Sequence, residues 1–201
     1  MDRKQHWETV YSTKSDGEVS WFQPTPETSL RMIGSRPLSS RIIDIGGGAS
    51  RLVDALLDRG YSELSVLDIS AAALSVAKYR LGSRAGSVNW IVADITQWRP
   101  LGTFDVWHDR AVFHFLTEAS DRRAYIASLQ SALTKNGAAI IATFAEDGPE
   151  RCSGLPVQRY SPETLRAELG PSFRLVESTV ESHSTPAGKE QRFQFSRFEF
   201  C

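Results

Sequence analysis

The sequence predicts an α/β fold, in which a doubly wound, mostly parallel sheet of seven strands ends in an antiparallel hairpin. From residue 41 onward, short apolar runs alternate with segments of helical spacing, a pattern typical of a parallel sheet covered by helices. The final third instead carries two strand-like runs joined by a short turn, which predicts the hairpin. The chain has 201 residues, 41% of them hydrophobic, which is enough for one domain with a substantial core.

The first two strand–helix units show this alternation directly. The apolar run 41–45 leads into Gly46, Gly47 and Gly48, and then into a helical pattern that ends at Gly60. The run 64–69 leads into Ser70, a favourable N-cap residue, and a second helical pattern that ends before residue 82. Each segment therefore predicts a strand, a tight turn and a helix.

The remaining elements follow in order. Three further strands are predicted at 88–94, 104–109 and 137–144, a helix at 121–133, and the closing strands at 173–181 and 191–200. Before the first strand, 4–13 and 26–34 have helical patterns around a loop at 15–24. We predict a single domain, 1–201, with a helical lid segment at 1–36, a cofactor-binding core at 37–145, and a C-terminal helix and hairpin at 146–201.

Charge and cysteine content exclude several classes of protein. Lys and Arg number 23 against 24 Asp and Glu, so the chain lacks the positive field that binds polyanions, which disfavours nucleic acid as a partner. Cys152 and Cys201 lie far apart, which argues against a disulfide framework or a thiolate metal site, and we expect no metal. With no apolar run of about 18 residues, we expect a soluble, cytoplasmic protein without a membrane span.

Acidic residues end four of the predicted strands: Asp44, Asp68, Asp94 and Asp109. Ligands of open α/β sheets bind at the carboxyl ends of the strands. A single carboxylate there is explained as a helix cap or a turn residue, whereas four in succession indicate a ligand site. A glycine turn before a helix N-terminus favours an anionic or zwitterionic group.

The carboxylates at the second and third strand ends, Asp68 and Asp94, suggest an adenosine ligand. The carboxylate at the second strand suits a ribose diol, and the one at the third strand suits an adenine amine. The dinucleotide motif G-x-G-x-x-G requires a third glycine at Arg51, which disfavours a nicotinamide-dependent oxidoreductase.

Four segments, in this order, resemble the motif series of class I S-adenosylmethionine-dependent methyltransferases, whose fold is Rossmann-like. They are 43–50 (IDIGGGAS), 67–70 (LDIS), 92–95 (VADI) and 104–116 (FDVWHDRAVFHFL). The likeness extends over about residues 5–145, although Ser50 stands where the family has a further glycine and is expected to cap the following helix. The segments 6–11 and 20–23 resemble the part of small bacterial-type and lysine-directed members that folds over the cofactor.

The resemblance implies S-adenosylmethionine as cofactor and S-adenosylhomocysteine as product. The methionine part of the cofactor is expected at Asp44 and the three glycines, and its ribose at Asp68. Asp94 would accept from the adenine amine, while Ile69 and Ile95 either cover the two faces of the ring or pack in the core. Asp109 would border the transferred methyl group, and the lid residues expected over the cofactor are Tyr11 and Trp21.

Methyl transfer is an in-line displacement that depends mainly on holding two reactants close and aligned. If the acceptor must lose a proton, His114, with His108 and Asp109, forms the predicted base cluster, although a histidine in Phe-His-Phe also suits core packing. Tyr11 is a second candidate, as an orienting hydroxyl. The aromatic residues that could exclude water from the site are Trp21, Phe22, Trp107 and Phe113.

The acceptor is predicted to be a small molecule or a protein side chain such as lysine. The Asn/Asp-Pro-Pro-Tyr motif of nucleobase amino-methyltransferases is absent from the sequence. Residues 145–156 either line the acceptor entrance or form a solvated loop. The alternative function is a catalytically silent module that binds S-adenosylmethionine and acts through a partner.

Overall fold

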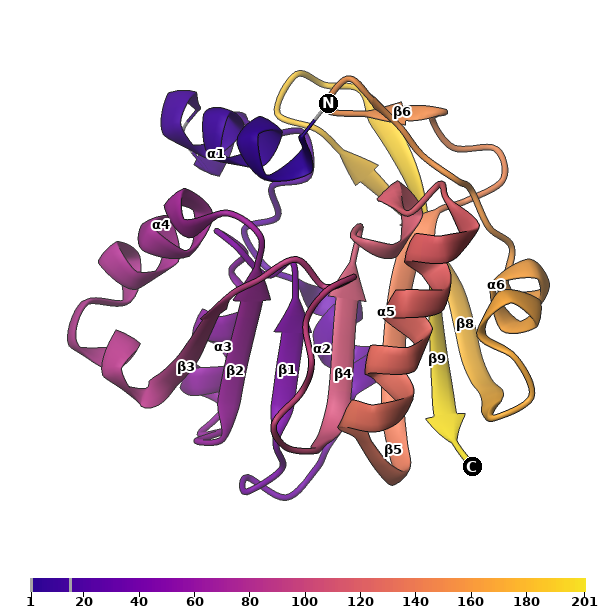
Figure 1. Ribbon diagram of the computed structural model, residues 1–201. Helices are drawn as coiled ribbons and strands as arrows, with labels where there is room; N and C mark the ends of the chain where they lie inside the picture. Colours follow the sequence, from indigo (N-terminus) through magenta and orange to yellow (C-terminus); the bar gives the residue numbers. More distant parts are fainter. Residues whose placement is uncertain (1, 15) are drawn as a thin grey trace.

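The computed structural model describes residues 2–14 and 16–201, and a seven-stranded sheet forms its centre (Figure 1). The strand order is β3-β2-β1-β4-β5-β9-β8; β9 is antiparallel to β5 and to β8, and the other neighbours are parallel. This confirms the predicted doubly wound, Rossmann-like fold class with its closing hairpin. The strands are β1 (Ile42–Ile45), β2 (Leu64–Asp68), β3 (Val88–Val92), β4 (Phe104–Arg110), β5 (Leu133–Phe144), β8 (Phe173–Ser184) and β9 (Glu190–Phe200).

Helices cover both faces of this sheet. One face packs against α2 (Glu27–Ile33), α3 (Leu52–Asp58) and α4 (Ala71–Leu81), and the other against α5 (Ala119–Ala132) and α6 (Pro162–Leu169). Every residue of β1 and β2 is buried, as expected for central parallel strands with apolar side chains on both faces. The described residues also form three short 3-10 turns, η1 (Asp16–Glu18), η2 (Gly82–Ser87) and η3 (Phe113–Phe115), of which η3 contributes buried residues to the core.

Two further elements lie outside these layers. Helix α1 (Arg3–Thr13) crosses the carboxyl ends of the strands (Figure 1), and none of its residues is fully buried. Strands β6 (Arg151–Cys152) and β7 (Leu155–Pro156) form a small separate hairpin, which the sequence did not predict. A polar contact joins α1 to this hairpin, since Nε2 of His6 lies 3.3 Å from Oγ of Ser153.

Most predicted element boundaries agree with the structure within a few residues. The main difference is β5, which begins at Leu133 instead of residue 137, directly after α5. Leu133 is buried and pairs with Phe104, and an irregularity in the β4–β5 register accommodates the extra residues. Met1 and Ser15, which begin the predicted lid segment and the predicted loop, lie outside the described residues.

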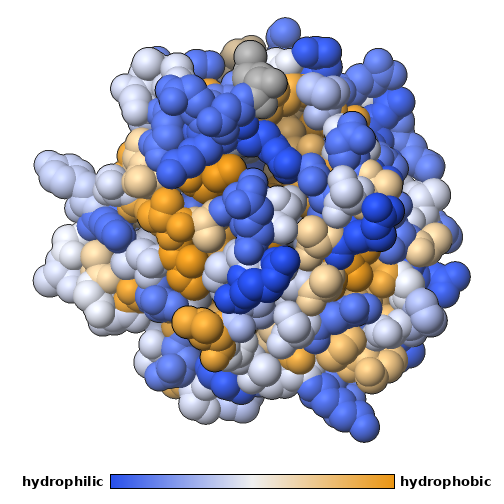
Figure 2. All heavy atoms as spheres, viewed as in Figure 1, coloured by the Kyte–Doolittle hydropathy of each residue, from blue (hydrophilic) through white to orange (hydrophobic). Residues whose placement is uncertain are grey.

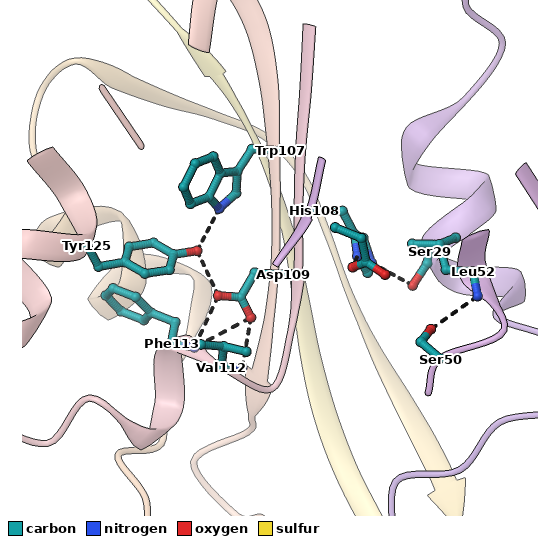
Figure 3. A network of polar contacts seen from close by, with 10 residues as sticks. Ser29, Ser50, Leu52, Trp107, His108, Asp109, Val112, Phe113 and Tyr125 are labelled. Atoms are coloured by element: carbon teal, nitrogen blue, oxygen red, sulfur yellow. Dashed lines mark hydrogen bonds and ion pairs between the residues drawn. The ribbon is translucent and has the colours of Figure 1, made fainter. Parts of the chain in front are cut away.

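Ser70 is the N-cap of α4 as predicted, whereas the N-cap of α3 is Arg51, which makes no side-chain cap bond, and Ser50 lies one residue before it. Oγ of Ser70 accepts from the amide of Ala73 (3.1 Å) at the start of α4. Oγ of Ser50 accepts from the amide of Leu52 (3.1 Å) in the first turn of α3 (Figure 3). The helix that follows the glycine turn therefore begins correctly without a further glycine.

Within the described part of the chain, no helix has both the length and the apolar character needed to cross a bilayer.

A buried polar network fixes the turn after β4. Tyr125 donates its hydroxyl to Oδ2 of Asp109 (2.7 Å) and accepts from Nε1 of Trp107 (2.8 Å), while Oδ1 of Asp109 accepts from the amide of Val112 (2.8 Å; Figure 3). These bonds hold a tight turn in which Ala111 has a φ of 74°. Trp107 and Phe113, predicted as candidates for the cleft, are instead fully buried in the core around Tyr125.

Tyr125→Phe is expected to lower the free energy of unfolding by about 2–3 kcal/mol, because Trp107 loses its acceptor and a buried carboxylate loses a donor. Urea unfolding measures this difference. The matched control is Tyr79→Phe, whose side chain is 92% exposed and which should unfold like the wild type. Equal stability of the two variants would contradict a stabilising role for the network.

Candidate active site

A cleft opens over the carboxyl ends of the central strands, beneath α1. Its larger part encloses about 770 Å³ when the open mouth is counted. In Figure 2, apolar residues gather below the mostly hydrophilic surface of α1. The sheet side contributes Asp68, Ile69, Asp94 and Ile95, and the covering side contributes Trp7, Tyr11 and Trp21. The predicted residues of the second and third strand ends therefore meet in one cleft.

A second part of about 580 Å³ lies between the glycine turn and the segment that precedes α2. Asp44, Gly46, Gly47 and His108 line it. The two parts adjoin, since both are lined by Tyr11, Trp21, Gly46 and Arg110.

The glycine turn lies directly against neighbouring side chains. A Cβ at Gly46, where φ is 66°, would collide with the side chain of Val112. A Cβ at Gly48 would lie 2.7 Å from Oδ2 of Asp68. The turn therefore requires glycine, and it brings backbone amides next to a carboxylate at the cleft wall.

Asp68 is the most strongly perturbed carboxylate of the cleft. Its side chain is buried, and Oδ1 accepts from the amide of Ser70 (2.8 Å). Burial, with the nearby charges of Asp44 and Glu8, raises the pKa of Asp68 to about 7. A buried carboxylate with this pKa gains from a ligand that brings hydrogen-bond donors.

Asp94 and the two isoleucines form the next section of the wall. Oδ1 of Asp94 accepts from the amide and the hydroxyl of Thr96 (2.9 and 2.8 Å). Among the described residues Oδ2 has no donor, so it is available to a ligand. Ile69 and Ile95 both line the cleft, which gives this section apolar faces next to the Asp94 carboxylate.

Asp44 is held by a chain of polar contacts on the α2 side of the sheet. Its Oδ1 lies 2.7 Å from Nδ1 of His108, and Nε2 of His108 lies 2.9 Å from Oγ of Ser29 (Figure 3). Since a carboxylate only accepts, Nδ1 carries a proton. All three side chains are buried. This series of contacts therefore orients Asp44, and Ser29 is not exposed as a nucleophile.

Helix α1 and the loop that follows it as far as Trp21, here called the covering segment, contribute an aromatic wall to the cleft. Nε1 of Trp21 donates to the hydroxyl of Tyr11 (3.1 Å), and the ring of Trp7 lies 5.5 Å from Trp21 and 5.2 Å from Phe115. Burial, with the charge of Asp68, raises the pKa of Tyr11 far above its usual value, so its phenol stays protonated. Tyr11 and Trp21 therefore lie at the cleft, where a phenol that stays protonated can form hydrogen bonds but cannot accept a proton as a base.

A carboxylate joins this cover to the core. Glu8 of α1 accepts from the first two amides of α4, Ala71 (2.8 Å) and Ala72 (3.1 Å). Burial alone would raise the pKa of Glu8, but these amides lower it by more, so its net pKa is below the usual value. An anion at a helix N-terminus is favourable, and this contact fixes α1 over the cleft.

The structure does not bring the predicted base cluster together. His108 and Asp109 are neighbours in β4, so their side chains point to opposite faces of the sheet (Figure 3). Asp109 lies in the core, where burial raises its pKa to about 6. Of this cluster only His108 lines the cleft.

His114 is also remote from the cleft. It is fully buried, its Nδ1 accepts from the amide of Phe144 (3.3 Å), and its ring packs against Phe115 and Phe144. Burial, with the charge of Arg110, lowers the pKa of His114 to about 3. Its placement argues for the packing interpretation and against the predicted role as a base.

Three residues that the sequence did not single out contribute to the site: Arg110, Glu8 and Ser29. Arg110 donates to the carbonyl of Trp21 (2.9 Å) and lines both parts of the cleft, and Cys152, within the 145–156 segment predicted as an entrance or a loop, lines the larger part. Glu8 and Ser29 act through the contacts above. Arg110 is the last residue of β4 and follows the predicted Asp109. The rule that ligands bind at the carboxyl ends of strands therefore indicated the right position in the chain, but it did not say which of the two residues faces the cleft.

Within the described residues, no three potential metal ligands are grouped.

The comparisons with known proteins agree with this geometry. Residues 42–137 match the model of a methyltransferase domain family. The chain is 27% identical over 106 residues to the eEF1A lysine and N-terminal methyltransferase of Mus musculus; the match spans 52% of this chain but only 15% of the mouse protein.

Solved structures match over the whole chain. The N-methyltransferase NodS from Bradyrhizobium japonicum WM9, in complex with S-adenosylhomocysteine, has a TM-score of 0.73 at 17% identity, covering 99% of both chains. A structure concerned with the conversion of a disulfide bond into a thioacetal group during echinomycin biosynthesis has a TM-score of 0.76 at 21% identity, covering 98% and 92%. The chain has the Rossmann-like fold of these methyltransferase structures. The predicted resemblance to the S-adenosylmethionine-dependent methyltransferases is confirmed by these likenesses, in which residues 42–137 match a methyltransferase domain model.

Proposed function

We propose that the protein binds S-adenosylmethionine in this cleft and transfers its methyl group to a small molecule or a protein side chain. The observation that carries the proposal is the convergence of Asp44, Asp68 and Asp94, which end or follow three neighbouring strands, on two adjoining parts of the cleft beside the glycine turn. These groups match the donors of an amino-acid tail, a ribose and an adenine amine.

The residues present fit the cofactor. Asp94 would accept from the adenine amine between the apolar side chains of Ile69 and Ile95. Asp68, whose raised pKa marks a carboxylate short of donors, would accept from the ribose hydroxyls. The glycine turn and Asp44 would hold the methionine end, with His108 keeping the Asp44 carboxylate oriented.

When bound, S-adenosylmethionine supplies an electrophilic methyl group on a sulfonium. The contribution of the chain is to hold the reactants close and aligned, and the wall formed by Trp7, Tyr11 and Trp21 excludes water. Because His114 and Asp109 do not reach the cleft, we propose no proton transfer by either. The mouse relative is named for lysine and N-terminal methylation, and NodS for N-methylation, so amines are the acceptors to test first.

The wild-type protein is expected to bind S-adenosylmethionine and S-adenosylhomocysteine saturably in isothermal titration. Asp68→Ala should weaken binding by about 1–3 kcal/mol, because hydrogen bonds to a charged acceptor are lost. Asp58→Ala, which changes an exposed carboxylate paired with Arg84 on the outer surface, is the matched control and should bind normally. No saturable binding by the wild type would contradict the proposed function.

Methyl transfer separates an enzyme from a silent binding module. With S-adenosylmethionine labelled at the methyl group and a fractionated cell extract, the wild type is expected to label a protein or small-molecule fraction, and Asp68→Ala to label it less. A silent module would bind the cofactor yet label no fraction.

Affinity for S-adenosylhomocysteine is expected to rise from pH 5.5 through pH 7 and to level off toward pH 8. The ionised form of Asp68 accepts both ribose donors, and its pKa is about 7. Titrations of the wild type and of Asp68→Asn across this range measure the effect, and the variant should lack the dependence on Asp68. In the unliganded protein the sign is opposite: the folded state keeps a proton that the unfolded chain releases near pH 4, so the contribution of Asp68 to stability falls as pH rises toward 7. An affinity that falls with rising pH would contradict the assignment.

A further inference from the structure

Arg110 lies at the junction of the two parts of the cleft and is unused by the cofactor contacts proposed above. It is the last residue of β4, and its guanidinium carbon lies 4.5 Å from the centre of the Phe193 ring. Nη1 donates to the carbonyl of Trp21 (2.9 Å). The side chain is therefore held in one place, between the sheet and the covering segment.

The other edge of the guanidinium has no partner. Nε and Nη2 are hidden from water, and no residue of the described ranges 2–14 and 16–201 accepts a hydrogen bond from either. These two nitrogens carry parallel N–H bonds along one edge of the planar guanidinium, which is the arrangement that pairs with both oxygens of a carboxylate. Burial lowers the pKa of Arg110 to about 10, so the group is still a cation at neutral pH.

The nearby carboxylates of the chain do not satisfy this edge. Glu181 and Asp44 act on Arg110 through their charge, but neither forms a hydrogen bond or an ion pair with it among the described residues. Glu181 instead accepts from Nε2 of Gln23 (2.6 Å), and Asp44 contacts His108 (2.7 Å). A buried cation with two unpaired donors is costly, and a bound anion would remove that cost.

The position of the guanidinium favours the acceptor over the cofactor as the source of that anion. Phe193 belongs to β9 and pairs with Phe144 at the end of β5. In the sheet order, β5 and β9 lie on one side of β4, whereas the glycine turn, Asp68 and Asp94 follow β1, β2 and β3 on the other. The Phe193 ring that holds the guanidinium therefore lies on the side of β4 away from those strands, while Arg110 also lines the part of the cleft formed by Asp44 and the glycine turn.

We propose that the Nε–Nη2 edge of Arg110 binds a carboxylate group of the methyl acceptor. This inference rests on the proposed function and names the substrate class: a molecule that carries a carboxylate at a fixed distance from the methylated atom. Since Nη1 is held by the carbonyl of Trp21, entry of the ligand displaces the loop that carries Trp21 and exposes the edge. The aromatic wall next to Arg110 then contacts the remainder of the acceptor.

Benzoate and acetate serve as probes, with benzamide and acetamide as uncharged analogues of matched shape. Binding is measured by titration at constant ionic strength, with and without S-adenosylhomocysteine, for the wild type, Arg110→Gln and Arg110→Lys. Arg174→Gln is the matched control, because Arg174 is an exposed arginine of the closing hairpin that pairs with Glu199. Thermal melting of each variant checks folding, and Arg110→Lys keeps the charge if Arg110→Gln does not fold.

The wild type is expected to bind benzoate at least about tenfold more tightly than benzamide, and Arg110→Gln to lose that preference. Arg110→Lys should retain part of it, because an ammonium attracts the carboxylate without offering two parallel donors. Arg174→Gln should match the wild type. Affinity for S-adenosylhomocysteine should change by less than about twofold in Arg110→Gln, since the lost contact belongs to the acceptor.

Three results would overturn the proposal. They are no binding of either carboxylate by the wild type, equal benzoate binding by the wild type and by folded Arg110 variants, and a selective loss of S-adenosylhomocysteine affinity in Arg110→Gln. The last result, with unchanged affinity for 5′-methylthioadenosine, which lacks the amino-acid part, would assign the carboxylate to the cofactor. Failure of the wild type to bind S-adenosylhomocysteine would contradict the proposed function instead, and the titrations without it would still decide the role of Arg110.

Discussion

The site depends on the burial of two carboxylates, Asp44 and Asp68, at the ends of neighbouring strands beside a turn without side chains. Burying charge is unfavourable, and the chain compensates only in part: His108 contacts Asp44, and the backbone amides of Ile69 and Ser70 donate to Asp68. The remaining deficit shows in the raised pKa of Asp68. A ligand rich in donors would relieve this deficit, so the cost to the unliganded fold becomes affinity for such a ligand.

The alternation of side chains along β4 divides the molecule into a structural side and a binding side. Trp107 and Asp109 point into the core, where they hold the turn that follows the strand. His108 and Arg110 point to the other face, where they meet Asp44 and the covering segment. One strand therefore supplies both the rigidity of the cleft edge and two of its polar side chains, and neither function interferes with the other.

The cover of the cleft is built differently from the core beneath it. Helix α1 buries no residue fully and is joined to the core by Glu8 at the N-terminus of α4 and by edge-to-face aromatic contacts. A segment with little buried apolar surface opens locally at lower cost than the core does. The cover is thus the part of the structure best suited to admit and release a ligand while the strand ends stay in place.

The sequence by itself determined the strand–helix alternation, the serine cap of α4, the glycine turn and the succession of strand-end carboxylates, because each depends on residues that are close together in the chain. Only the tertiary structure decided which of those side chains meet. Asp109 and His114 were predicted at the cleft from their place in the sequence, but strand pairing and packing direct both into the core. Ser29, Glu8 and Arg110 gained their roles from partners 79, 63 and 89 positions away, a distance over which no local pattern carries information.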